Sequence, residues 1–388
     1  MSEIPIGYLV GTIAAATIAY LALWPIPRPG PRMTVSMVLG MSGSEIPFLF
    51  LALNLFSVAI AASEGSIASV PAYLGLALSL FAIVGQIVVI VRATRTLPTI
   101  ADALGEGFGA TNLRRTLRVQ DWLRAVLTPL HVPRRDVERI NDVSYGPHGR
   151  ANMLDLYRSR TPKPARGILI QLHGGGFFGG RKSKEARLLM ERLAADGWLC
   201  LSANYRLLPA AFPDQVVDAK RAIAWARAHA DEYGADPGTV ALVGGSAGAH
   251  VAMICALTGG DPRFQPGFED AETSVVAVIG LYGYYGPAPT SGPPSDPLDY
   301  LSEPDKGRRA DIPAIMIVHG DRDPMVAAAS ARELASQLRT ASASPVVYAE
   351  LPGAHHTLDR FDSLRCAGVV DGVEEFLRRA LPRSADGV

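Results

Sequence analysis

The hydrophobic and polar positions of the chain follow different patterns before and after about residue 95. Three long apolar runs without a charged residue occupy the first part: residues 4–24, 46–62 and 70–91. About 20 consecutive apolar residues form a helix long enough to cross the hydrocarbon core of a bilayer. Tyr20 and Trp24 lie near the end of the first run, as suits aromatic rings in the headgroup zone. The pattern therefore predicts an all-α membrane region with three transmembrane helices.

Charged residues around the three runs predict their orientation. Arg28 and Arg32 separate the first two runs, and six arginines follow the third run before residue 125. The segment before the first run and the loop between the second and third runs carry only Glu3 and Glu64. Basic loops stay on the cytoplasmic side, so we expect a multi-pass protein of the cell membrane with an outside N-terminus and a cytoplasmic C-terminal part. A cleaved signal peptide is the alternative for the first run, but no basic stretch precedes it and two more runs follow.

A more polar stretch joins this region to the rest of the chain. Within residues 112–130, apolar residues such as Val119, Leu123 and Leu127 recur at helical spacing, with four arginines among them. One interpretation is a basic amphipathic helix on the membrane surface, and the other is a helix packed on the following domain. The predicted division is a membrane region (residues 1–95), an amphipathic linker (residues 96–135) and a globular domain (residues 136–388).

From residue 136 onward, short apolar runs alternate with segments of helical period. The expected strands are residues 142–145, 153–157, 167–172, 198–203, 239–243, 274–279, 314–318 and 346–351. The expected helices are residues 183–196, 213–233, 327–339 and 368–381. This alternation is typical of an α/β domain whose mostly parallel sheet is covered on both faces. The Pro- and Gly-rich stretch 283–304 is too polar for the core, and we expect it near the entrance of a site.

Composition narrows the functions that the chain can have. The formal net charge is zero, with 37 basic and 37 acidic residues, so no overall charge favours binding to nucleic acid. The cysteines Cys200, Cys255 and Cys366 are far apart and match neither a zinc pattern nor a disulfide framework. Cys200 and Cys255 lie in apolar runs, where we expect buried free thiols.

The sequence Gly244-Gly-Ser246-Ala-Gly248 lies between an apolar, β-branched run and an Ala-rich helical segment. A strand–turn–helix of this kind holds the serine hydroxyl above the end of a sheet, and small neighbours let the two backbones pass closely. The N-terminus of the helix then lies beneath an anion formed at the serine. This context predicts that Ser246 is a nucleophile.

A glycine-rich segment upstream fits an oxyanion hole. His173-Gly-Gly-Gly-Phe177 directly follows the expected strand 167–172. Acyl transfer creates a negatively charged oxygen, and glycines without Cβ atoms let backbone N–H groups approach it. The residue after the nucleophile, Ala247, offers a further N–H group.

An acid and a base follow the nucleophile in the order that a catalytic triad requires. Asp321 and Asp323 follow the strand 314–318, and His355 and His356 follow the next expected strand. The carboxylate would orient the imidazole, and the imidazole would take the proton of the serine. The residue types predict the triad and leave both members of each pair as candidates.

The chain from about residue 136 to residue 381 resembles the hormone-sensitive-lipase-like branch of the α/β-hydrolases. Three motifs carry the resemblance, in the order of that branch: His173-Gly-Gly-Gly-Phe177, Asn204-Tyr-Arg-Leu-Leu-Pro209 and Gly244-Gly-Ser-Ala-Gly248. The resemblance implies an α/β-hydrolase fold and an ester hydrolase. It differs at two positions: Gly245 stands where the family often has Asp, and His250 stands where Asn is common. We expect His250 to pack in the core.

The family motifs also imply individual roles. The acid belongs to an Asp-Pro step followed by Leu or Met, which implies Asp323. The base lies two residues before an apolar residue, which implies His356. The same matching implies an oxyanion hole formed by Gly175, Gly176 and Ala247.

The sequence thus predicts a membrane-anchored serine carboxylesterase or lipase that needs no metal and no organic cofactor. Its partners would be an ester substrate, including lipid esters, and the bilayer. One alternative is an acyltransferase, in which an acceptor alcohol replaces water in the second step, because its motifs would be identical. The second alternative is a non-enzymatic membrane scaffold, but the glycine loop and all candidate triad residues are present.

Overall fold

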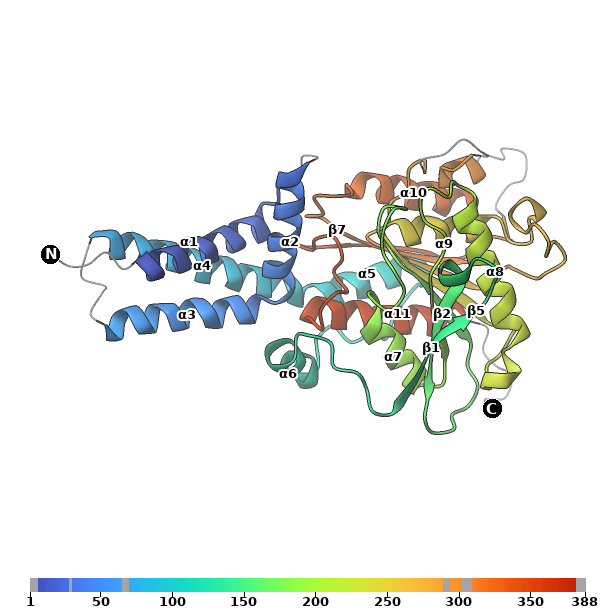
Figure 1. The fold of residues 1–388 in the computed structure, drawn as a ribbon, viewed down its shortest axis with the longest axis horizontal. Coiled ribbons are helices and arrows are strands. Elements are labelled where there is room, and N and C mark those ends of the chain that lie inside the picture. The colour runs from blue at the N-terminus through green and yellow to red at the C-terminus, as the bar shows by residue number, and fades with distance from the viewer. Residues whose placement is uncertain (1–5, 28–29, 65–69, 289–293, 302–308, 382–388) are drawn as a thin grey trace.

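The molecule is elongated, with a bundle of helices at one end and a sheet between layers of helices at the other (Figure 1). The structure is a computed structural model that describes residues 6–27, 30–64, 70–288, 294–301 and 309–381. The two patterns of the sequence therefore correspond to two regions that follow one another along the long axis.

Four helices form the bundle end: α1 (Ile6–Leu23), α2 (Pro31–Glu45), α3 (Pro47–Ser63) and α4 (Val70–Thr94). α1, α3 and α4 run along the long axis, whereas α2 lies across their ends, next to the globular part (Figure 1). The chain bends by 89° between α2 and α3. The bend lies at Ile46 because the residue before a proline avoids the helical conformation, and Pro47 then begins a new helix.

The bundle has the composition of a membrane region. Among the described residues, α1 and the continuous helix 70–108 are long and apolar enough to cross a bilayer, and the bent pair α2–α3 is a third candidate. Large apolar side chains such as Phe56 and Leu80 are exposed on its surface. Inside, the Asn54 side chain donates to the carbonyl of Ser79 at 3.0 Å. The three predicted runs overlap α1, α3 and α4, whereas no element was expected where α2 lies.

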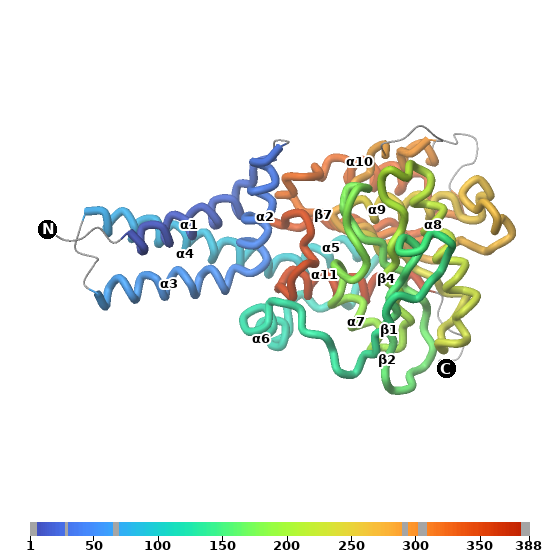
Figure 2. The backbone as a smooth tube through the Cα atoms, viewed as in Figure 1, coloured from blue at the N-terminus to red at the C-terminus, as the bar shows by residue number. Residues whose placement is uncertain are grey.

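Two helices connect the bundle to the sheet. α5 (Thr96–Phe108) continues α4 with a single intervening residue and carries the chain into the globular part, as Figure 2 shows. α5 packs so closely on the C-terminal helix that a Cβ atom at Gly372 would lie 2.4 Å from Ile100 Cγ2. α6 (Val119–Leu127) buries Ala125 and Asp121. The division at residues 95 and 135 remains a prediction, and α5 belongs to the layer that covers the sheet.

The globular end is built on one eight-stranded sheet in the order β1-β2-β4-β3-β5-β6-β7-β8. The strands are β1 (Val137–Ser144), β2 (Met153–Ser159), β3 (Ile168–Leu172), β4 (Leu199–Ala203), β5 (Val240–Gly245), β6 (Ala277–Leu281), β7 (Ala314–Gly320) and β8 (Val346–Leu351). β1 and β2 pair antiparallel to their neighbours, and all other pairs are parallel. This confirms the predicted α/β class with a mostly parallel sheet, and each expected strand overlaps an observed one.

Helices cover both faces of the sheet. One face packs against α8 (Asp214–Ala228), α9 (Ala247–Leu257) and α10 (Ala328–Ala341), and the other against α5, α7 (Arg187–Ala195) and α11 (Leu364–Ala380). The first core layer includes Val251 and Leu334, and the second includes Leu189 and Val373. Because parallel strands end at a common edge, the loops after β3, β5, β7 and β8 meet there.

Candidate active site

Ser246 lies in the sharp turn between β5 and α9. Its φ of 52° and ψ of −117° are a strained backbone conformation for a residue with a side chain. The flanking glycines make the turn possible: a Cβ atom at Gly244 would lie 2.3 Å from the carbonyl oxygen of Gly248, and a Cβ atom at Gly248 would lie 2.1 Å from that of Leu172. Any larger residue would push the strand and helix apart. The turn therefore holds the Ser246 hydroxyl above the sheet edge.

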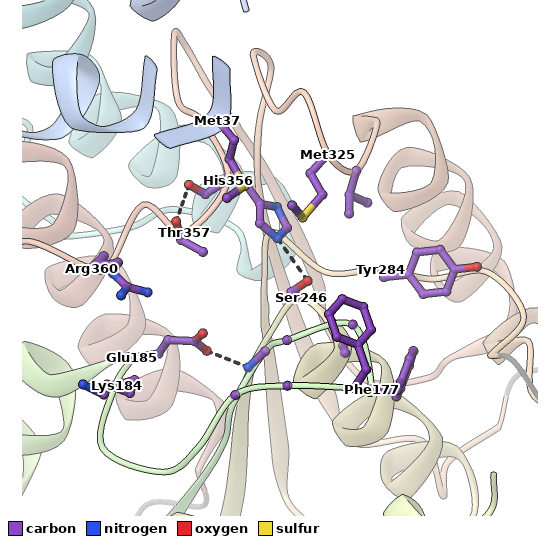
Figure 3. A pocket seen from close by; sticks show the side chains of 18 of the residues that line it. Met37, Phe177, Lys184, Glu185, Ser246, Tyr284, Met325, His356, Thr357 and Arg360 are labelled. Atoms are coloured by element: carbon purple, nitrogen blue, oxygen red, sulfur yellow. Dashed lines mark hydrogen bonds between the residues drawn. The ribbon is translucent and has the colours of Figure 1, made fainter. Parts of the chain in front are cut away.

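The structure brings Ser246, His356 and Asp323 together (Figure 3 shows the Ser246–His356 contact). His356 Nε2 lies 3.0 Å from Ser246 Oγ, and His356 Nδ1 lies 2.6 Å from Asp323 Oδ2. Since an ionised carboxylate can only accept, Nδ1 donates to Asp323, and Nε2 is left to accept the serine proton. The three residues come from the loops after β5, β8 and β7, which are separated in sequence but end at the same edge of the sheet.

Asp323 is held in the ionised form. Burial alone would raise its pKa, but the hydrogen bond and charge of His356 hold the pKa below the ordinary value of 3.8. The backbone N–H groups of Met325 and Val326 also donate to Asp323 Oδ1, at 2.8 and 2.9 Å. His319 lies behind it, with Nε2 3.5 Å from Asp323 Oδ2. The carboxylate is therefore fixed in position and able to orient the imidazole.

The other two candidates of the sequence contact other parts of the chain. Asp321 Oδ1 accepts the N–H of Gly353 at 2.6 Å. His355 Nε2 lies 2.9 Å from the carbonyl oxygen of Ala22 at the end of α1, and burial lowers the His355 pKa to about 4. Asp321 braces the loop that carries the base, whereas His355 attaches that loop to the bundle.

The glycine loop after β3 lies beside the nucleophile. A Cβ atom at Gly174 would be 3.1 Å from Ser246 Cβ. Gly175 and Gly176 have φ values of +129° and +62°, and a Cβ atom at Gly175 would lie 2.1 Å from the carbonyl oxygen of Gly179. Ala247 is the first residue of α9, where backbone N–H groups have no acceptor within the helix. Gly175, Gly176 and Ala247, the three residues predicted for the oxyanion hole, line the same cavity as Ser246.

A buried carboxyl pair, which the sequence analysis did not single out, supports the glycine loop. Glu185 Oε2 accepts the N–H of Gly174 at 2.7 Å. Burial and the neighbouring Asp359 raise the Glu185 pKa to about 8. Asp359 accepts from the Tyr282 hydroxyl at 2.7 Å and from the Ala186 N–H at 2.8 Å. One proton shared by the pair avoids two like charges in a buried place.

This pair also explains the departure from the family at Gly245. A Cβ atom there would lie 2.5 Å from the Tyr282 hydroxyl and 2.9 Å from Glu185 Oε2. The space that an Asp before the nucleophile would need is therefore taken by Glu185 and Tyr282. His250 is fully buried, with Nε2 2.7 Å from the carbonyl oxygen of Ser295, and burial lowers its pKa to about 4. It packs in the core, as expected.

A cavity of about 780 Å³ opens beside Ser246. In Figure 3, Phe177, Tyr284 and Met325 lie on one side of Ser246, and Glu185 and Arg360 lie on the other. The apolar side suits an acyl chain, and the charged side suits a polar group. Tyr284 belongs to the stretch expected near the entrance; residues 289–293 and 302–304 of that stretch lie outside the described residues.

Met33 and Met37 of α2 also line this cavity, although they are more than 200 residues away from Ser246 in the chain. No pattern in the sequence points to them, because no helix was expected there and methionines outside a motif are ordinary apolar residues. Among the described residues, no three His, Cys, Asp or Glu side chains are grouped to hold a metal ion.

Known proteins resemble the chain in sequence and in fold. The BD-FAE family model matches residues 154–289. A probable carboxylic ester hydrolase, LipM of Mycobacterium tuberculosis, is 34% identical and covers 96% of this chain and 93% of its own. Esterase LipQ of the same organism is 37% identical over 64% of each chain. The solved structure of Thermogutta terrifontis esterase 2 has a TM-score of 0.52 and 25% identity, and covers 63% of this chain and 94% of its own.

The similarity to LipM extends through the bundle as well as the globular part, since it covers nearly the whole chain. A truncated carbohydrate esterase from gut microbiota, 20% identical with a TM-score of 0.52, shares the fold over 63% of this chain and 99% of its own. The strand order, the serine turn and these relatives agree with one another. The chain belongs to the carboxylic ester hydrolases of the hormone-sensitive-lipase-like branch of the α/β-hydrolases.

Proposed function

We propose that the protein is a membrane-anchored serine carboxylesterase or lipase that forms an acyl-enzyme on Ser246. The observation that carries the proposal is the position of His356, whose two ring nitrogens lie 3.0 Å from Ser246 Oγ and 2.6 Å from Asp323 Oδ2. These distances allow proton transfer from the hydroxyl and stabilisation of the resulting imidazolium.

The reaction begins when Ser246 Oγ attacks the ester carbonyl and His356 Nε2 takes the serine proton. Backbone N–H groups of Gly175, Gly176 and Ala247 stabilise the oxyanion, at the N-terminus of α9. His356 then gives the proton to the leaving alcohol, which breaks the C–O bond and leaves the acyl group on Ser246. A water molecule, deprotonated by His356, attacks the acyl carbonyl; the released acid and the restored hydroxyl complete the cycle.

We further propose that α1, the α2–α3 pair and α4 anchor the enzyme in the cell membrane. α1 has 18 residues and a length of about 27 Å, close to the thickness of a hydrocarbon core. α2, which contains Arg32, and the junction of α4 and α5, at Arg95, lie at the bundle end next to the sheet, whereas α3 ends at Ser63, before Glu64, at the far end. By the positive-inside rule the catalytic end faces the cytoplasm.

Replacing Ser246 by Ala tests the mechanism. We expect the rate of hydrolysis of a nitrophenyl butyrate to fall about 10⁵-fold or more, because the variant lacks the hydroxyl that His356 can deprotonate. A fluorophosphonate probe should label the wild-type protein and the control variant Ser336→Ala, and leave Ser246→Ala unlabelled. Undiminished turnover by Ser246→Ala would refute the assigned nucleophile. Product analysis with added alcohols separates hydrolysis from acyl transfer, since a transferase would form a new ester.

A further inference from the structure

We infer that the active site takes its ester from the bilayer, so that its substrates are long-chain esters dissolved in the membrane that anchors the enzyme. The inference rests on the proposed function and adds to it the substrate class and the direction of access. It is based on α2, which forms a wall of the catalytic cavity and lies at the boundary of the bundle.

The direction of α2 places it along the membrane surface. Spans cross the bilayer along the long axis of the molecule, and α2 meets α3 at 89°. Val35 and Val38 of α2 are 55% and 47% exposed, whereas Gly40, Met41 and Glu45 are buried. A helix that exposes apolar side chains in the plane where spans end suits the boundary between headgroups and acyl chains.

The helix α6 is independent evidence for the level at which the spans end. Figure 1 shows α6 at the same level as α2 along the long axis, where the spans end. Its residues Val119, Leu123 and Leu127 are 76%, 54% and 70% exposed. The Trp122 ring makes an edge contact with Phe48 near the start of α3, at 6.1 Å between centroids. Two helices with exposed apolar faces at one level define where the hydrocarbon ends.

The cavity beside Ser246 lies next to α2, at the level that α2 and α6 mark. Met33 and Met37, one helical turn apart on α2, line it, and Figure 3 shows Met37 beside His356. Phe178 and Met325 also line it and are 75% and 42% exposed. Large apolar side chains exposed around a site mark contact with an apolar partner. A volume of about 780 Å³ is much more than a short acyl group fills.

The C-terminal half of α2 is bonded to the loop that carries His356 and to the start of α11, and these contacts hold α2 against the site. The Thr357 hydroxyl donates to Met41 Sδ at 2.7 Å, and the Ser363 hydroxyl donates to Glu45 Oε2 at 2.7 Å. Glu45 also forms an ion pair with Arg365 in which both side chains are fully buried. An ester can therefore reach Ser246 from the membrane by passing the N-terminal half of α2, at Met33 and Met37.

Vesicles that contain the enzyme and its ester together, or apart, test the direction of access. The full chain is placed in vesicles of ether-linked phosphatidylcholine, which has no ester bond. Dioleoylglycerol is added either to the same vesicles or to separate ones, and oleate release is measured over a time short compared with lipid exchange. We expect oleate to be released about ten times faster, or more, when the enzyme and the ester share vesicles than when they are in separate ones. A shared bilayer raises the effective concentration of the ester at the enzyme. If oleate release is equally fast in both arrangements while nitrophenyl butyrate is hydrolysed normally, the inference is refuted and the proposed function is not affected.

A pair of double variants tests the path along α2. In Met33→Gln/Met37→Gln, the shape of the wall is kept and its apolar surface is lost, so we expect dioleoylglycerol hydrolysis to fall about tenfold more than butyrate hydrolysis. The control Val119→Gln/Leu123→Gln removes apolar surface at the same spacing on α6, whose residues are not among those that line the cavity, and should leave the ratio of the two activities unchanged. An unchanged ratio in the α2 variant would refute the path. A wild-type protein that hydrolyses neither ester would overturn the proposed function, and this inference with it.

Discussion

At the scale of single residues, the two members of the pairs Asp321/Asp323 and His355/His356 make different contacts. In each pair one side chain belongs to the proposed triad, and the other contacts backbone elsewhere and holds the loop in place. Asp323 binds the imidazole of His356, whereas Asp321 accepts a backbone N–H from the loop of the base. Substitutions that remove the charge of one side chain and keep its shape can therefore distinguish a catalytic role from a role in holding the loop.

We expect Asp323→Asn to lower kcat for nitrophenyl butyrate by about 10⁴-fold, because an amide favours the wrong tautomer of His356. Asp321→Asn is the matched control, and its amide oxygen can still accept the Gly353 N–H. We expect it to change kcat less than about tenfold, since it does not touch the imidazole. Steady-state kinetics of the two purified variants measure the difference. A larger loss in Asp321→Asn would reverse the assignment of the acid.

The buried pair Glu185–Asp359 predicts a pH dependence of stability. The Glu185 pKa is raised from 4.5 to about 8, so the folded protein keeps a proton that the unfolded chain loses. The free energy of unfolding should therefore fall as the pH rises from 4.5 through 8. In Glu185→Gln this titration is absent, and the amide can still accept the Gly174 N–H. The variant should lose less thermal stability than the wild type between about pH 5 and about pH 9. Equal losses would contradict the prediction.

Much of the chemistry at this scale follows from the sequence, and the rest needed the fold. Ser246 and the glycines could be predicted because a serine turn and an oxyanion loop restrict backbone geometry, and the glycines are visible in the sequence. The residues by themselves did not separate Asp321 from Asp323, since both follow the same strand and only the three-dimensional path of the loop decides. Glu185 and Met37 carried no motif, because their roles depend on contacts with distant segments.

At the scale of elements, α2 is held in place by packing rather than by propensity. Its sequence contains Gly40 and Gly43, which weaken an isolated helix. Both allow close approach: a Cβ atom at Gly40 would lie 2.7 Å from the carbonyl oxygen of Leu21, and one at Gly43 would lie 2.7 Å from Ile18 Cγ2. The apolar runs predicted α1, α3 and α4, whereas α2 was not predicted because it is stabilised by neighbours far away in the chain.

The ion pair between Glu45 and Arg365 predicts a large effect on stability. Both side chains are fully buried, and Arg365 Nη1 also donates to Ser44 Oγ at 3.0 Å. Glu45→Gln should destabilise the protein by about 3–5 kcal/mol, because it leaves a buried guanidinium without its carboxylate. The double variant Glu45→Gln/Arg365→Met should recover part of this loss, as a double-mutant cycle in denaturant can measure. Additive effects would show that the two charges are not coupled.

At the scale of the whole molecule, the proposed arrangement of the spans predicts which residues a reagent outside the cell can reach. Cys200, Cys255 and Cys366 are buried, so the wild-type background of labelling should be low. Glu64→Cys introduces a thiol at the bundle end away from the sheet, and Ser336→Cys introduces an exposed thiol on α10. A membrane-impermeant maleimide added to intact cells should label Glu64→Cys and spare Ser336→Cys until the cells are broken. The opposite pattern would invert the proposed orientation.

The buried ion pair between Glu45 and Arg365 limits the order in which the parts of the protein can assemble. These residues are 320 positions apart, so the ribosome completes almost the whole protein before the second partner emerges. The helical bundle is synthesised first, and the segment that carries His356 can pack against it only at the end of synthesis. A soluble fragment cut off after the helices would lack the carboxylate that neutralises Arg365 and the wall that α2 supplies. The smallest fragment that keeps this ion pair and the whole cavity therefore includes the helical bundle, and we expect hydrolysis only from chains that contain it.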